Sequence, residues 1–183
     1  MKKILGLLVL VITAASCSES VDQRFVWGND QVGLINKETK IFELDSLFKN
    51  DSIINPIKGD EFGNGPNTID IYEKGGKHLL SLTPKEALDS TSTIDYVLIK
   101  DDRYLTDKGI GLNSTFKQIA GAYEVSSVDN IIDDAMIRLK NQNFYFTISK
   151  ETFPDEVRFD MEKAIELTMI PEEVTPEAIF VRW

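Results

Sequence analysis

The sequence has few of the residues from which catalytic and metal centres are usually built. Its 183 residues include one cysteine, Cys17, and one histidine, His78. A disulfide joins two cysteines, and a zinc site combines several Cys and His ligands, so neither is expected. The Gly-x-Ser-x-Gly motif of many serine hydrolases is missing, and His78 is expected to be structural or solvent-facing. We therefore expect no cofactor, no metal ion and no enzymatic activity.

Basic residues are also scarce. Lysine and arginine together number 20 against 30 acidic residues, which gives a formal net charge of −10. An acidic surface is repelled by nucleic-acid phosphates, and no cluster of Lys or Arg offsets this repulsion, so nucleic acid is not an expected partner. The chain is 42% hydrophobic and 27% charged, which is typical of a globular protein, and its length favours a single domain.

The apolar run at the N-terminus, residues 4–12, is too short for a transmembrane helix, which needs roughly 20 residues. Lys2 and Lys3 precede this run, and the small residues 13–16 follow it. A positive start, a short apolar core and small residues at the cleavage point are the three parts of a secretory signal peptide. The sequence therefore predicts export of the chain, with residues 1–16 removed.

Cys17 directly follows this leader, in the tetrapeptide Ala14-Ala15-Ser16-Cys17. The tetrapeptide resembles the lipobox of bacterial lipoprotein signals. The resemblance implies a diacylglyceryl group in thioether linkage on Cys17, cleavage just before it, and acylation of the new amino terminus. Two or more acyl chains give stable membrane anchoring, at about 0.8 kcal/mol per buried methylene. The alternative is an ordinary cleaved leader that leaves Cys17 as an unmodified thiol.

The lipoprotein hypothesis divides the chain into three parts. These are the signal peptide at residues 1–16, the lipidated cysteine and a polar tether at residues 17–23, and one globular domain at residues 24–183. In two-membraned bacteria, lipoproteins retained in the inner membrane carry aspartate directly after the lipidated cysteine. This chain has Ser18 at that position, which resembles the lipoproteins of the outer membrane. The protein is therefore expected on a membrane of the cell envelope, held there by its lipid.

Alternating apolar and polar residues predict β-strands in the body of the chain. The strands predicted in this way are residues 69–72, 80–82, 96–99, 135–139, 144–148 and 178–183. Turn signals at 73–77 and 141–143 join four of them into two antiparallel hairpins. The unbroken apolar run at 96–99 predicts a strand buried on both faces. A first strand or hairpin is predicted within residues 24–36.

Apolar residues spaced three and four apart predict helices at residues 41–48 and 116–123. Thr115 and Gln118 form a capping-box signature at the start of the second helix. A third helix is predicted over residues 154–165, because a proline opens it and two acidic residues follow. Its predicted apolar stripe consists of Val157, Met161, Ala164 and Ile165. Strand hairpins with two or three short helices indicate an α+β fold with a largely antiparallel sheet.

A glycine-rich loop gives the best candidate for a metal site, although a weak one. Its oxygen ligands are Asp60, Glu61, Asn64, Asn67 and Asp70. Calcium takes about 6–8 oxygen ligands from such loops, but the spacing does not match an EF-hand. The preferred interpretation is an acidic loop without a metal, and a calcium-binding or small-ligand module is the alternative hypothesis.

Adjacent carboxylates and glycines give two further candidates. Three carboxylate pairs, at residues 101–102, 133–134 and 172–173, are expected to be solvated, and a hydrolase built on two carboxylates is the third hypothesis. Gly109 and Gly111 superficially suggest a phosphate loop, but its third glycine and its Gly-Lys-Ser/Thr ending are missing. These glycines are predicted to form a tight turn from a strand into the following helix.

Several short segments resemble an uncharacterised group of envelope proteins, the sigma-E-regulated lipoprotein family. The clearest such segment is residues 108–116. There Gly-Ile is followed by any one residue, then by an aliphatic residue, and then by a Ser-Thr-Phe sequence that opens a helix. Residues 33–35, 76–82 and 179–183 follow the same order along the chain. The family brings no assigned catalytic residues, so the resemblance implies only an envelope location and a role in envelope upkeep. The leading hypothesis is a non-catalytic, lipid-anchored protein that either engages an envelope protein or supports the envelope under stress.

Overall fold

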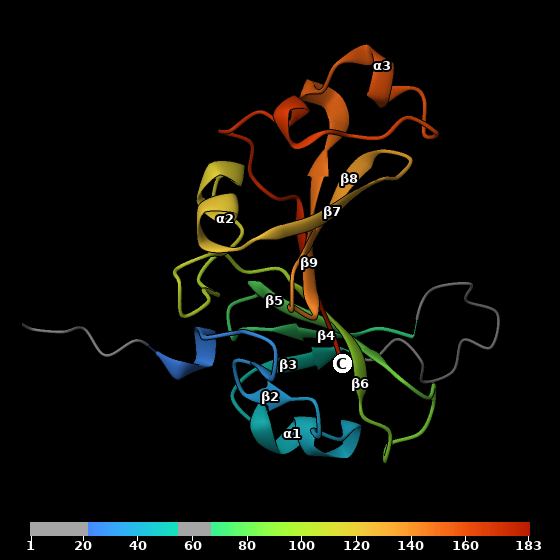
Figure 1. Cartoon of the computed structure of the whole chain (residues 1–183). Coiled ribbons are helices and arrows are strands. Elements are labelled where there is room, and N and C mark those ends of the chain that lie inside the picture. The colour runs from blue at the N-terminus through green and yellow to red at the C-terminus, as the bar shows by residue number, and fades with distance from the viewer. Residues whose placement is uncertain (1–21, 55–66) are drawn as a thin grey trace, which may run out of the picture.

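The computed structural model describes residues 22–54 and 67–183, which form a single α+β domain (Figure 1). Eight strands make one antiparallel sheet in the order β3-β4-β5-β6-β10-β9-β8-β7. Their bounds are β3 Ser52–Ile54, β4 Ile69–Tyr72, β5 His78–Pro84, β6 Ile94–Ile99, β7 Val125–Asn130, β8 Asp134–Leu139, β9 Phe144–Ser149 and β10 Ala178–Arg182. Strands β1 (Gln31–Val32) and β2 (Ile35–Asn36) form a small second sheet. The predicted fold class is confirmed.

The helices of the described residues are short. The α-helices are α1 Leu44–Leu47, α2 Phe116–Ala122 and α3 Asp155–Arg158, and the 3-10 helices are η1 Gln23–Phe25, η2 Ile41–Glu43, η3 Lys150–Thr152 and η4 Leu167–Met169. Within residues 22–54 and 67–183, no helix is long and apolar enough to cross a membrane.

Strand β10, at the C-terminal end of the chain, joins two halves of the large sheet. It pairs antiparallel with β6 on one side and with β9 on the other, so that Ile179 lies opposite both Ile99 and Phe146. In Figure 1 the green strands β4–β6 and the orange strands β8 and β9 lie at a steep angle to each other. Such an angle is expected across a sheet of this width, because neighbouring strands twist by about 20–25°.

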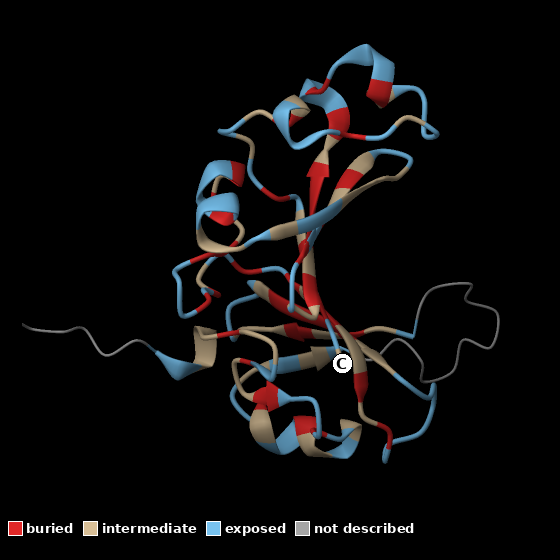
Figure 2. Cartoon of the chain, in the orientation of Figure 1, coloured by how far each residue is buried: buried red, intermediate tan, exposed pale blue. Residues whose placement is uncertain are grey.

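One face of the large sheet carries the hydrophobic core. Five side chains from five neighbouring strands form a row across this face, Leu80, Ile99, Ile179, Phe146 and Ile137, and each is fully buried (Figure 2). Burying a side chain of this size stabilises the fold by about 1.5–3 kcal/mol. The N-terminal segment, α1, α2 and α3 each contribute buried residues to the same core.

Both predicted hairpins are confirmed. Strands β4 and β5 pair with Ile69 opposite Leu82, and glycines with positive φ at Gly75 and Gly76 form the turn between them. Strands β8 and β9 pair with Ile137 opposite Phe146, in agreement with the alternation that predicted them. The predicted final strand is β10, and the predicted N-terminal hairpin is the pair β1–β2.

Two of the three predicted helices are confirmed. Elements η2 and α1 together cover residues 41–47. At the start of α2, Thr115 Oγ1 accepts a hydrogen bond from the Gln118 amide at 3.3 Å, and Gln118 Oε1 accepts one from the Thr115 amide at 2.8 Å. These two bonds complete the predicted capping box. Before this helix, Gly109 has φ +73° in the tight turn that the glycines predicted.

The third predicted helix is wrong beyond Arg158, where α3 ends. The predicted apolar stripe of residues 154–165 included Met161, but its side chain is exposed. A longer helix would use the carbonyls of residues 157 and 160 in its own hydrogen bonds. Instead, the Asn130 side-chain amide donates to three carbonyl oxygens in the segment 157–163, at 3.2, 3.0 and 2.9 Å. Tertiary hydrogen bonds have replaced the helical ones.

Strand β6 also differs from its prediction. Ile94, Val97 and Ile99 are buried, but Tyr96 and Leu98 between them are partly exposed. The strand is therefore buried on one face rather than on both. The two edge strands β3 and β7 were not predicted, because their sequences are short or polar and lack a clear alternation of apolar residues.

Candidate functional site

The second face of the large sheet carries partly exposed aromatic residues. Leu98, Phe180 and Tyr145 lie side by side on β6, β10 and β9, because Phe180 is opposite both of the others in the strand register. The rings of Tyr145 and Phe180 stack with their centroids 5.0 Å apart and an angle of 14° between their planes. This surface, which also includes Tyr96 and Arg182, is called the open face below.

A cleft of about 530 Å³ lies at one end of the open face. Its lining includes Tyr96, Arg138, Asn143, Tyr145, Arg182 and Trp183. Of the residues that the structure describes, those lining the cleft include two arginines and no acidic side chain, although acidic residues outnumber basic ones in the chain. We call this hollow the arginine cleft.

Arg182 is positioned by its neighbours on β6. The strand register places it opposite Tyr96, and its guanidinium carbon lies 5.0 Å from the centre of the Tyr96 ring. Arg182 Nε lies 3.6 Å from Asp95 Oδ1, which is an ion pair without a close hydrogen bond. A cation over an aromatic face is attracted by about 0.5–1 kcal/mol at an exposed site. The guanidinium is thus oriented by a ring and by a carboxylate.

Arg138 is positioned in the same manner on β8. Its Nε donates to Asp129 Oδ2 at 2.6 Å, and its guanidinium carbon lies 5.6 Å from the centre of the Tyr145 ring. Burial and the nearby Tyr96 raise the pKa of Tyr145, while Arg138 and Arg182 oppose this change. The Tyr145 hydroxyl therefore stays protonated at neutral pH and can donate a hydrogen bond.

The Nη groups of both arginines are unused by the described residues. The contact of Arg138 to Asp129 and that of Arg182 to Asp95 involve Nε, and no hydrogen bond from an Nη atom to the described part of the chain is present at either residue. Each guanidinium carries five N–H donors, four of them on the Nη atoms. Both side chains are about half exposed, at 51% and 62%. Their free donors therefore face the cleft or the solvent.

The N-terminal segment holds two residues of the cleft lining, Asn143 and Trp183. The backbone oxygen of Asn29 accepts hydrogen bonds from Trp183 Nε1 at 2.8 Å and from Asn143 Nδ2 at 2.7 Å. The backbone N–H of Asn143 in turn donates to Asn29 Oδ1 at 3.1 Å. These bonds hold the Trp183 indole in place beside the β8–β9 turn. Asn29 therefore fixes two residues of the cleft from outside its lining.

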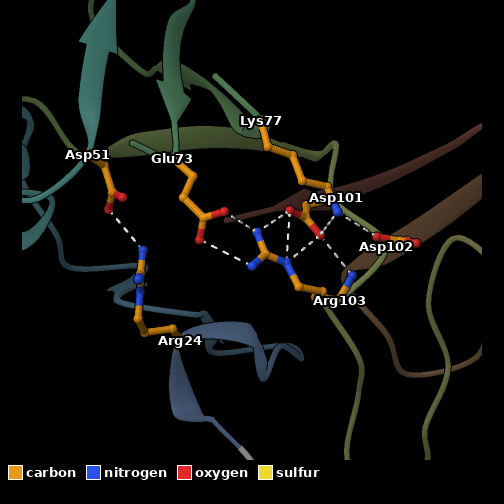
Figure 3. Close-up of polar contacts among 7 residues, drawn as sticks. All are labelled: Arg24, Asp51, Glu73, Lys77, Asp101, Asp102 and Arg103. Atoms are coloured by element: carbon orange, nitrogen blue, oxygen red, sulfur yellow. Dashed lines mark hydrogen bonds and ion pairs between the residues drawn. The ribbon is translucent and has the colours of Figure 1, made fainter. Parts of the chain in front are cut away.

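A second cluster, the Arg103 clamp, lies at the β4–β5 turn and consists of Arg103, Glu73, Asp101, Lys77 and Asp102 (Figure 3). Arg103 donates through Nη1 and Nη2 to the two oxygens of Glu73 at 3.1 and 3.0 Å. Its Nε and Nη2 donate to Asp101, the closest contact being 2.6 Å. Lys77 Nζ lies 3.2 Å from Asp101 and 3.0 Å from Asp102.

The clamp holds its buried carboxylate in the ionised form. The Asp101 side chain has no exposed surface, so burial alone would raise its pKa. Hydrogen bonds from Arg103 and Lys77 outweigh burial and lower the pKa of Asp101 to about 2. The expectation that residues 101–102 form a solvated pair is therefore wrong for Asp101, while Asp102 is half exposed. A carboxylate that stays ionised at neutral pH is unsuited to general acid catalysis.

The clamp also holds the N-terminal segment against the sheet. The Arg103 guanidinium carbon lies 4.2 Å from the centre of the Phe25 ring, and that ring meets Tyr104 edge-on at 5.1 Å. One residue earlier, Arg24 Nη2 donates to Asp51 at 2.9 Å, an ion pair also drawn in Figure 3. The clamp is therefore a structural feature that ties η1 to the turn between β4 and β5.

Ser81, His78 and Asp70 also come together, on the neighbouring strands β4 and β5. Ser81 Oγ donates to Asp70 Oδ1 at 2.6 Å, and His78 Nε2 lies 3.1 Å from Ser81 Oγ and 3.3 Å from Asp70 Oδ1. In a catalytic triad the two ring nitrogens of histidine serve different partners. Here a single nitrogen faces both groups, and the serine proton points to the aspartate. The arrangement does not activate Ser81 as a nucleophile.

The structure describes only part of the predicted calcium loop. Asp60, Glu61 and Asn64 lie outside the described residues, whereas Asn67 is exposed and Asp70 belongs to β4. Because Asp70 already contacts Ser81 and His78, it is not a free loop ligand. Within residues 22–54 and 67–183, no three His, Cys, Asp or Glu side chains are grouped as a metal site would require. Cys17, the predicted lipidation site, also lies outside the described residues.

The other two carboxylate pairs differ in their surroundings. Burial raises the pKa of Asp134, and the neighbouring Asp133 adds to the effect. Both residues line a second hollow, of about 660 Å³, together with Glu151, Glu177, Lys150 and Arg158. In the third pair, Glu172 forms an exposed ion pair with Lys117 at 2.7 Å.

Comparisons with known proteins identify one structural neighbour. The sequence matches no protein-family model and no curated protein. The crystal structure of the uncharacterized protein YfeY from Escherichia coli is similar, with a TM-score of 0.52 and 11% sequence identity. The similarity covers 85% of this chain and 97% of that chain. At this level of identity the similarity concerns the fold, which the two proteins share over most of their length.

The sequence analysis did not predict the arginine cleft. The alternation in the second hairpin already placed Met136, Arg138 and Tyr145 on the same face of the predicted sheet. That signal was present, but nothing local indicated that β10 would bring Arg182 alongside Tyr96. The cleft depends on this long-range pairing, and a polar residue on an exposed strand face has no distinctive pattern of its own.

Proposed function

We propose that the protein is a lipid-anchored protein of the cell envelope that acts by binding rather than by catalysis. The arginine cleft is the proposed binding site and Cys17 the proposed point of lipid attachment. The observation that carries the binding proposal is the pair Arg138 and Arg182, which share one cleft and have unused Nη donors. Polar groups held at fixed positions beside aromatic side chains can orient a ligand in such a cleft.

Two of the other polar clusters, the Arg103 clamp and the group of Ser81, His78 and Asp70, lack the features of a hydrolase. In the Arg103 clamp, Asp101 is held ionised by neighbouring cations, whereas a general acid needs a raised pKa. In the cluster on β4 and β5, the Ser81 proton is directed to Asp70 and not to a histidine base. Neither cluster has the geometry of a nucleophile with its base. The calcium alternative is also weakened, because Asp70 is engaged by protein groups.

The anchor is proposed from the leader and the tetrapeptide before Cys17. It would place the acidic domain at a membrane surface, attached through residues 17–23, where the cleft could meet another envelope component. We propose an envelope protein as the partner, in line with the non-catalytic role. A body that carries an excess of negative charge is repelled by anionic lipid, so the tether and not the domain would supply membrane attachment.

Cell fractionation with mass spectrometry tests the anchor. We expect the natural chain in the membrane fraction, with an amino-terminal peptide that begins at Cys17 and carries acyl mass. Cys17→Ala should remove the acyl mass and leave the exported protein soluble, whereas Ser20→Ala, a control in the tether, should behave as wild type. Recovery of Cys17→Ala in membranes at the wild-type level would show that something other than this thiol attaches the protein.

A further inference from the structure

The charged side chains that line the arginine cleft are basic, although the protein as a whole is acidic. The chain has a formal net charge of −10, and the second hollow, of about 660 Å³, is lined by four acidic residues and two basic ones. Among the described residues, the arginine cleft is lined by two arginines and no acidic side chain. Asp129 and Asp95 each pair with one arginine from outside this lining, so the charged N–H donors that these pairs leave free, and not a net positive charge, are what favour a negatively charged ligand.

The geometry of the two arginines suits a planar or tetrahedral oxyanion. Asp129 contacts Arg138 through Nε and Asp95 contacts Arg182 through Nε, so the outer edge of each guanidinium, formed by the two Nη atoms, remains open. Tyr145 and Tyr96 support the flat faces of the two groups. Paired, parallel N–H donors match the oxygens of carboxylate and phosphate groups. Support by a ring and a carboxylate also reduces the entropy lost when a ligand binds.

We propose that the arginine cleft binds an oxyanion, the carboxylate or phosphate group of its ligand, through Arg138 and Arg182. The inference rests on the proposed binding function and names the chemical group that this site recognises. The Tyr145 hydroxyl and the Asn143 side chain lie in the same lining and supply further polar contacts beside the two guanidiniums. The volume of about 530 Å³ leaves room for an attached body next to the charged group.

Calorimetric titration of the purified domain with small probes tests the proposal. The probes are inorganic phosphate, succinate and, as an uncharged control, glycerol, all at constant ionic strength. Vesicles of phosphatidylcholine with and without phosphatidylglycerol distinguish a lipid phosphate from a free one. Side-chain Nε–H signals of Arg138 and Arg182 in NMR spectra report whether a probe enters the cleft. Because the domain is used without its lipid, the result is independent of whether Cys17 is an anchor.

Arg138→Gln and Arg182→Gln should each weaken binding about tenfold, which corresponds to the loss of one charge-assisted contact. Arg138→Lys and Arg182→Lys keep the charge but lose the paired donors, and their affinity should fall between those of wild type and the Gln variants. Arg158→Gln is the matched control, because Arg158 also lies over an aromatic ring and beside an aspartate but lines the acidic hollow. Its affinity should equal that of wild type.

The outcomes separate clearly. Saturable binding of phosphate, succinate or phosphatidylglycerol with a Kd of about 1 mM or tighter, weakened about tenfold in each Gln variant, supports the proposal and identifies the group, whereas binding that neither Gln variant weakens overturns it. No saturable binding of any anionic probe overturns it, as does binding that glycerol reproduces or that Arg158→Gln weakens equally. Either of these results would leave the proposed anchor untouched, because the anchor is judged by Cys17→Ala alone.

Discussion

Removal of the Arg103 guanidinium should destabilise the fold through the carboxylate that it leaves behind. Asp101 is completely buried and makes its closest contact, 2.6 Å, with Arg103. Breaking a buried ion pair by deleting one partner costs about 3–5 kcal/mol, because an uncompensated charge remains in the protein. Lys77 still lies 3.2 Å from Asp101, so we expect the lower end of this range for Arg103→Met, about 3 kcal/mol.

The stability contributed by Asp101 should also depend on pH, and the lowered pKa of this residue sets the direction of the change. The pKa of Asp101 is lowered from 3.8 to about 2, which corresponds to about 2 kcal/mol at roughly 1.4 kcal/mol per pKa unit. A carboxylate whose folded pKa lies below its unfolded value stabilises the fold above that unfolded value, and the stabilisation disappears as the pH falls towards the folded pKa. Wild type should therefore lose about 2 kcal/mol from this group between about pH 4 and pH 2. Asp101→Asn should not show this loss.

Urea unfolding followed by the fluorescence of buried Trp27 measures these differences. At pH 7, Arg103→Met should unfold at a lower urea concentration than wild type, whereas the double variant Asp101→Asn, Arg103→Met should recover part of the loss, since no buried charge remains. Arg158→Met removes a surface arginine and should change the unfolding free energy by less than about 0.5 kcal/mol. The reasoning is refuted if Arg103→Met matches Arg158→Met at pH 7, or if the double variant is less stable than Arg103→Met alone.

Two further substitutions probe local features of the fold. Asn130→Ala removes three hydrogen bonds from the side-chain amide to the segment 157–163. It also removes Asn130 Oδ1, which at 2.7 Å is the only hydrogen-bond acceptor that the described chain offers to the buried Lys150 amine. We expect a loss of about 2–3 kcal/mol in unfolding free energy and faster limited proteolysis within 157–163; unchanged cleavage there would contradict the assigned role. Thr115→Ala should lower the unfolding free energy by about 1 kcal/mol in urea titrations, because the hydroxyl caps α2 through Gln118, and a change near zero would count against the cap.

The features that were predictable from the sequence are those set by local patterns. The hairpins β4–β5 and β8–β9 follow from alternation on both sides of a turn, and α2 follows from a capping box between Thr115 and Gln118. In each case the residues that decide the structure are neighbours in the chain, so local propensity and tertiary packing agree. The α+β fold class could therefore be predicted.

The features that were missed depend on contacts between distant segments. The apolar residues beyond Arg158 have helical spacing, but the helix ends there. The side chain of Asn130 in β7 forms hydrogen bonds with carbonyl oxygens that a longer helix would have used. Asp101 was expected in solvent, but its side chain is buried and pairs with two cations, Lys77 from the β4–β5 turn and Arg103 from two residues further along the chain. Tertiary interactions routinely override local propensity, and a sequence without aligned relatives contains no record of which distant residues meet.

The N-terminal segment connects the Arg103 clamp with the arginine cleft. Phe25 lies against the Arg103 guanidinium, and the ring centroids of Trp27 and Phe144 of β9 are 4.8 Å apart in an edge-on contact. The backbone oxygen of Asn29 accepts a hydrogen bond from the indole of Trp183, which lines the cleft. All three belong to one short stretch that begins just after the proposed tether of residues 17–23. Because the same short segment contacts the clamp at Phe25 and the cleft residue Trp183 at Asn29, we expect Arg103→Met to affect the position of Trp183 as well as the stability of the fold. The proposed tether therefore enters the domain through a segment that contacts a residue of the proposed binding site.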